Sequence, residues 1–233
     1  MSSRKLTRSV IVGAAAIAVA GGSYGIVSAT SSSASAAAST TPAASSGSGG
    51  GGSNARSGPA AGGSSGTVGS LSTSGFTITT SAGQKVTVDE ASSTTYQKGT
   101  NPASVSAITT GEPVLVLGTT SGTTITATQV IVHPASSGTA ASAAAKVVPF
   151  QRGAPAASKQ VGQIPANYSE GSGTIVSGTA ANKATEAALA AYPGGVVDRV
   201  VKLSNGEYEV HYIGVNWPQH VFVSQDFKAA GAE

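Results

Sequence analysis

The chain has 233 residues, of which 10% are charged and 39% hydrophobic, and it contains no cysteine. The missing cysteine excludes disulfide bonds, zinc–thiolate sites, iron–sulfur clusters and cysteine nucleophiles. The net charge of +3 is unevenly spread, because residues 1–70 and 134–172 are basic while residues 71–133 and 173–233 are slightly acidic. Nucleic-acid binding requires a clustered basic face. Neither acidic region offers one, so we expect no nucleic-acid partner.

Residues 1–29 have the composition of a signal peptide or a signal-anchor. Three basic residues precede an uncharged, mostly apolar run, and Val27-Ser28-Ala29 supplies the small-residue pattern of a cleavage site. If it is retained, the run is just long enough to span a membrane. We therefore expect the rest of the chain to be extracytoplasmic, secreted or associated with the cell envelope. Any membrane contact would come only from an uncleaved leader.

Two segments read as spacers. Residues 30–65 are Ala, Ser, Gly, Thr and Pro, with no large apolar residue from Ser31 to Ser65. Such a chain cannot bury enough apolar area to offset its backbone entropy, so we predict a disordered linker. Residues 134–172 are rich in Pro, Ala and Ser and predict a second, flexible linker. The apolar island at 147–150 within it is expected to contact a neighbouring domain.

Residues 66–133 predict a small all-β domain. Short β-branched runs are separated by glycine turns, which is typical of a small antiparallel barrel or sandwich. Alternation at Phe76 and Ile78, and again at Val86 and Val88, turns one face of each strand inward.

This segment resembles a small domain of unknown function found in exported bacterial proteins. The resemblance implies a compact, OB-like β-barrel with no catalytic assignment. It is carried by Gly66-Thr67-Val68, Phe76-Thr77-Ile78, Gln84-Lys85-Val86-Thr87-Val88, Thr94-Thr95-Tyr96, Gly111-Glu112-Pro113-Val114-Leu115-Val116 and Ile125-Thr126-Ala127-Thr128-Gln129-Val130.

Residues 173–233 predict a separate α+β domain with one helix on a three-stranded antiparallel sheet. The helix is expected at 179–191 with Thr179 as its N-cap, and Asn205-Gly206 is a hairpin turn signal. Strands are expected at 196–203, 207–213 and 220–223. In the second strand alternation puts Tyr208, Val210 and Tyr212 on one face and Glu207, Glu209 and His211 on a solvent-exposed face. The predicted fold class of the whole chain is therefore α+β multi-domain.

The C-terminal segment also resembles a PepSY-type domain. The matching stretches are Tyr192-Pro193-Gly194-Gly195, Val200-Val201-Lys202-Leu203-Ser204-Asn205-Gly206, Tyr208-Glu209-Val210-His211 and Trp217-Pro218-Gln219-His220-Val221-Phe222-Val223 with Asp226-Phe227-Lys228. PepSY-type domains are viewed as extracytoplasmic interaction modules and as modulators of peptidases. The resemblance implies such a role here.

Candidate site residues are few. His211 and His220 could approach one another across two strands, and Glu209 or Asp226 could complete a metal site with them. Histidines on a polar strand face are more often solvated or hydrogen-bonded, so we expect no metal and no cofactor. No serine lies in a nucleophile elbow, and we expect no catalytic residues.

Trp217, with Tyr212 and His220, is the best candidate for a partner contact, although a lone tryptophan in a small domain is more often part of its core. Three functions remain open. The first is a non-enzymatic interaction module that binds an extracytoplasmic protein or peptide through the C-terminal domain. The second is a structural cell-envelope spacer. The third and weakest is a metal- or small-ligand-binding protein.

Overall fold

In this computed structural model, residues 58–132 and 147–233 are described. The leader (1–29) and most of the first predicted linker lie outside them. The N-terminal part of the described chain contains β1 (Ala60–Leu71), β2 (Gly75–Thr79), β3 (Lys85–Lys98), β4 (Asn101–Ala103), the short 3₁₀ helix η1 (Val105–Ala107), β5 (Pro113–Ser121) and β6 (Thr124–Val132). The rest contains β7 (Val148–Pro149), β8 (Val161–Gly162), β9 (Thr174–Ile175), α1 (Gly178–Ala191), β10 (Val196–Lys202), β11 (Tyr208–Ile213), β12 (Val215–Trp217), β13 (His220–Val223) and β14 (Ala229–Ala232).

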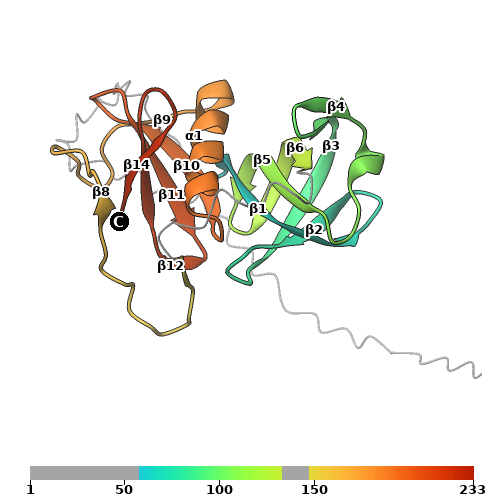
Figure 1. Cartoon of the computed structure of the whole chain (residues 1–233), viewed down its shortest axis with the longest axis horizontal. Helices are drawn as coiled ribbons and strands as arrows, with labels where there is room; N and C mark the ends of the chain where they lie inside the picture. The colour runs from blue at the N-terminus through green and yellow to red at the C-terminus, as the bar shows by residue number, and fades with distance from the viewer. Residues whose placement is uncertain (1–57, 133–146) are drawn as a thin grey trace, which may run out of the picture. The chain divides into compact units, whose positions relative to one another are not determined.

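Five strands close into a barrel in the order β1–β2–β3–β6–β5 and back to β1 (Figure 1). The predicted small barrel is therefore confirmed, with one difference from an antiparallel arrangement: β3 and β6 pair in parallel. Phe76, Ile78, Val86 and Val88 all point into its core, as their alternation predicts. Glycines at the turns adopt positive φ, for example Gly83 and Gly122.

The first strand begins at Ala60, inside the segment predicted as linker, so the boundary at residue 65 is wrong. The strand β1 has few large apolar side chains for a steric reason. Its partners β5 on one side and β2 and β10 on the other approach its backbone closely. A Cβ atom on Gly62 would lie 2.0 Å from the carbonyl oxygen of Val197, and one on Gly63 would lie 2.2 Å from that of Val116. The residues at the start of this strand are buried because they are small. A count of large apolar residues does not detect this kind of burial.

The C-terminal sheet runs in the order β10–β11–β13–β14–β8, and β9 pairs with the far end of β10. It has more strands than the three predicted, since β14, β8 and β9 extend it. Figure 1 shows α1 lying across one face of this sheet. The helix begins one residue before the predicted start. Ser177, rather than Thr179, is its N-cap, and it makes no side-chain capping bond. No helix in the described ranges is long and apolar enough to cross a membrane.

The barrel and the C-terminal sheet are joined by a strand pairing and share part of one core. β1 pairs with β10 at Gly63–Val197 and Ser64–Val196, and the Ser64 hydroxyl donates to the Gly195 carbonyl at 2.9 Å. Leu115, Leu117 and Ile131 of the barrel belong to the same buried cluster as α1. The Val114-Leu115-Val116-Leu117 run does not alternate because β5 is buried on both faces.

The second predicted linker contains ordered structure as well. β7 pairs with β12, with Val148 opposite Trp217, so the apolar island at 147–150 does contact a neighbouring element. Residues 133–146 lie outside the described ranges.

Candidate functional site

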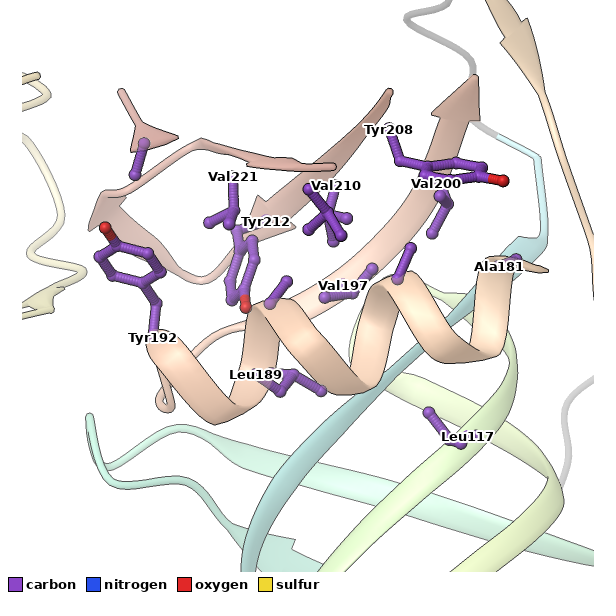
Figure 2. Close-up of a cluster of buried hydrophobic side chains, with 14 of the residues drawn as sticks. Leu117, Ala181, Leu189, Tyr192, Val197, Val200, Tyr208, Val210, Tyr212 and Val221 are labelled. Atoms are coloured by element: carbon purple, nitrogen blue, oxygen red, sulfur yellow. The ribbon is translucent and has the colours of Figure 1, made fainter. Parts of the chain in front are cut away.

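The inner face of the C-terminal sheet is apolar and covered by α1. Figure 2 shows Val197, Val200, Val210, Tyr212 and Val221 pointing from the strands toward the helix, and Ala181 and Leu189 of the helix belong to the same buried cluster. Tyr208, Val210 and Tyr212 share this face, as predicted. Since these side chains are buried on every side, the inner face offers nothing to a ligand.

Trp217, the best sequence candidate for a partner contact, lies in this core with 1% of its surface exposed. Its indole N–H donates to the Lys159 carbonyl at 2.8 Å, and its ring meets Tyr192 edge to face with centroids 5.7 Å apart. Tyr212 is buried beside it, and burial raises the pKa of its hydroxyl well above the ordinary value. His220 is also buried, so the structure does not present any of the three residues to a partner.

The outer face of the same sheet differs from the sequence prediction. Glu209 was expected to be solvent-exposed, yet it is 1% exposed. The reason is that the chain between β8 and β9 folds over this face and places Ile164, Tyr168 and Ile175 against Val201, Leu203 and Phe222. A linker composition gave no sign of this cover.

Ionisable side chains gather at one end of the outer face. His220 Nε2 lies 3.4 Å from Glu209 Oε1, and the His211 and His220 ring centroids are 5.1 Å apart. Asp198 joins the group through His211 Nδ1, at 2.5 Å, and through the buried Arg199, at 3.4 Å. The two histidines are therefore neighbours, as the sequence suggested. Arg199 is a member of the cluster that sequence reasoning missed.

Burial controls the protonation of the central pair. It raises the pKa of Glu209 to about 7, against the opposing effect of the Arg199 and His211 charges. It lowers the pKa of His220 to about 4, and the positive charges of His211 and Arg199 lower it further. Near pH 5.5 both side chains are therefore uncharged.

The cluster does not form the metal site that His211 and His220 could have built with Glu209 or Asp226. Asp226 is exposed and pairs with Lys228 at 2.6 Å, away from the two histidines. Within residues 58–132 and 147–233, no three His, Asp or Glu side chains are arranged to hold a metal ion. The buried guanidinium of Arg199 next to the histidines also disfavours a cation there.

An open groove lies where α1 passes the barrel. It has a volume of about 540 Å³ and a floor formed by Leu117 and Ile131. Its rim is polar and comes from β3, β6 and one stripe of α1: Gln97, Gln129, Thr179, Asn182, Lys183 and Glu186. The four helical residues recur at the three- and four-residue spacing of a single helix face, which is the sequence signal that could have found them.

Comparison with protein-family models, curated protein sequences and solved structures found no match for this chain.

Proposed function

We propose that this chain is an exported, non-enzymatic binding protein of the cell envelope or extracellular space, and that it holds a peptide segment of an extracytoplasmic protein. The observation that carries the proposal is the groove between the barrel and α1. Its volume of about 540 Å³ and its apolar floor under a polar rim are typical of ligand sites.

The rim chemistry favours a peptide. Gln97, Gln129 and Asn182 carry side-chain amides, each of which both donates and accepts hydrogen bonds. An extended peptide backbone offers alternating N–H and C=O groups that match them. Lys183 and Glu186 add one charge of each sign for the side chains of the bound segment.

The groove does not favour nucleic acid or catalysis. Single-strand binding on a barrel needs a basic groove with stacking aromatic rings. This rim holds one cation and one anion, both on exposed helix positions, and no aromatic side chain. A catalytic acid–base pair needs groups whose surroundings separate their pKa values. The groups that meet this condition, Glu209 and His220, lie on a different, covered face.

Two finer assignments belong to the same proposal. A five-stranded barrel whose third and last strands pair in parallel supports an OB-like classification. A helix packed on an antiparallel sheet supports the PepSY-like interpretation of residues 173–233. Such a domain would place the chain among extracytoplasmic modulators of peptidases, with the groove as the contact site.

The test uses a library of random twelve-residue peptides displayed on phage and panned against the full chain. An enriched peptide is then measured by fluorescence anisotropy. Loss of two amide hydrogen bonds in Gln97→Ala/Asn182→Ala should weaken its binding about tenfold, since each bond contributes about 0.5–1.5 kcal/mol.

Lys183→Ala and Lys202→Ala form a matched pair, because both remove an exposed lysine but only Lys183 lines the groove. The proposal expects an effect from the first variant alone. Equal binding by all variants would remove the groove from the contact, and failure to enrich any peptide would favour the structural-spacer alternative.

A further inference from the structure

Residues 159–176, called the strap here, cross the outer face of the C-terminal sheet from its β14 edge to β10. The strap begins where the Lys159 carbonyl accepts the Trp217 indole N–H. It pairs through β8 with β14, and Gln163 N–H donates to the Ala230 carbonyl at 3.0 Å. It ends through β9 on β10, where Val176 N–H donates to the Val200 carbonyl at 2.9 Å. Two two-residue strands thus anchor it at either end.

Between its anchors the strap covers two different surfaces. Tyr168 lies edge-on to Phe222, with ring centroids 4.7 Å apart, over an apolar patch that also contains Val201 and Leu203. The same ring lies 5.9 Å from that of His220, at the border of the ionisable cluster. The Tyr168 ring therefore covers part of the apolar patch and part of the ionisable cluster at the same time.

The buried ionisable groups under the strap are poorly paired. Arg199 Nε finds no hydrogen-bond partner among the described residues, and Glu209 Oε2 and Tyr168 Oη make no hydrogen bond of regular geometry, although the Tyr168 hydroxyl lies close enough to the Glu209 carboxyl to lower its pKa slightly. His220 Nε2 is close to Glu209 Oε1 but lacks hydrogen-bond geometry. A buried ion without full pairing is costly, and a neutral group is less so. Lifting the strap would let water reach all of these atoms.

The groups that face the pair come from every surrounding element. Asp198 and Arg199 belong to β10, His211 to β11, Glu233 to the chain end, and Tyr168 and Glu170 to the strap. This set contains charges of both signs, so no single neighbour decides whether Glu209 or His220 is protonated. The largest effect on both groups is their burial away from water.

We propose that the strap is a releasable cover whose docking holds Glu209 and His220 uncharged and whose release converts them into a hydrated carboxylate and imidazolium. Release exposes the edge of β10 at Val201 and Lys202, together with the apolar patch beneath Tyr168.

As the pH changes, ionisation of Glu209 and ionisation of His220 change the stability of strap docking in opposite directions. The pKa of Glu209 is raised to about 7 when the strap is docked, so docking is favoured at low pH and loses that advantage as pH rises from about 4.5 to 7. The pKa of His220 is lowered to about 4, so docking is favoured above about pH 6.5 and loses that advantage as pH falls toward 4. Between about pH 4.5 and 6.5 the two effects cancel, and a proton lost by Glu209 is matched by one gained by His220.

Native-state hydrogen exchange of the Gln163 and Val176 amides tests this inference at pH 5 and pH 6, after correction for intrinsic exchange rates. In the full-length wild type the opening constant should not change. In Glu209→Gln, His220 is the one member of the covered pair that still titrates, so the opening constant should fall about tenfold with this rise in pH. In His220→Gln, Glu209 is the one member of the pair that still titrates, and the opening constant should rise about tenfold over the same pH change.

Glu207→Gln is the matched control, because it removes a carboxylate from the same edge of the hairpin without touching the covered cluster, and it should behave like the wild type. Single variants without pH dependence, or with the same sign of dependence, would overturn the inference. So would strap amides that open only with the barrel amides of β6.

A measurement on the wild type guards against a variant that fails to fold. The chain has three histidines, so proton NMR can follow the His220 imidazole directly. A midpoint below pH 5 supports a neutral His220 under the docked strap, and a midpoint near 6.5 contradicts it.

Discussion

The two faces of the C-terminal sheet are both buried, but they are buried by different means. The inner face packs against α1 in a cluster of valines, alanines and aromatic rings that continues into the barrel through Leu115 and Leu117. The outer face is covered by a strap held by short strands, and beside an apolar patch it carries the ionisable side chains Glu209 and His220. Depth of burial alone therefore does not distinguish a structural core from a surface built to open. The chemistry of the buried side chains does.

The largest effect should come from the inner core. Replacing Trp217 with Ala removes its contacts with Tyr192 and the strap carbonyl, and should lower the free energy of unfolding by about 3–5 kcal/mol. Urea unfolding followed by far-UV circular dichroism measures it. Phe150→Ala is the control, because Phe150 is 61% exposed and its loss should cost less than about 0.5 kcal/mol. Similar losses in both variants would place Trp217 outside the core.

The outer face should respond to pH instead. In Glu209→Gln the carboxyl group whose pKa burial raises to about 7 is gone. The stability of the variant relative to wild type should therefore increase between pH 4.5 and 7, by on the order of 3 kcal/mol. Urea titrations at the two pH values measure this difference. A constant difference would mean that Glu209 is hydrated in the folded chain.

The attachment of the inner core to the barrel depends on the glycine pair Gly62-Gly63 near the start of β1. A methyl group on Gly63 would collide with the Val116 carbonyl, so Gly63→Ala should destabilise the chain by about 1–3 kcal/mol. Ser65→Ala, on the same strand, should stay within about 0.5 kcal/mol of wild type. Thermal unfolding of the three proteins measures the effect, and equal midpoints would show that β1 does not pack between β5 and β10.

The smallest effect should come from an exposed carboxylate, Asp226, whose pKa is shifted downward. Hydrogen bonds from Lys228 and Ser224 lower the pKa of Asp226 to about 2, but the group is fully solvated. Asp226→Asn should leave the midpoint of urea unfolding at pH 7 unchanged, since exposed ion pairs contribute little. A clear loss of stability would show that the hairpin after β13 depends on this pair.

Sequence patterns predicted the elements whose burial follows from alternation. Phe76, Ile78, Val86 and Val88 marked the barrel interior, and Tyr208, Val210 and Tyr212 marked the face under α1. Alternation failed for Glu209, because a strand pattern assigns faces but does not say what covers them. The strap that covers Glu209 contains three glycines, two serines and one proline among its 18 residues, and most of it falls in the segment predicted as a linker.

Composition failed at β1 for a different physical reason. Gly62, Gly63 and Ser64 are buried because backbone atoms approach too closely for larger side chains. The groove was also out of reach, since Gln97 and Gln129 lie on strands that meet α1 only after the barrel and the C-terminal sheet have joined through β1 and β10. Long-range pairings of this kind leave no local signal in the sequence.

The most direct test of the difference between the two faces is hydrogen exchange of the wild type at pH 5.5 across low concentrations of urea. The strap amide of Val176 should exchange through a local opening whose free energy hardly depends on urea, because little surface is exposed. The amides of β11 between β10 and β13 should exchange only through global unfolding, with a steep dependence on urea. If Val176 shows the same free energy and the same urea dependence as β11, the strap is an integral part of the core and the two faces do not differ.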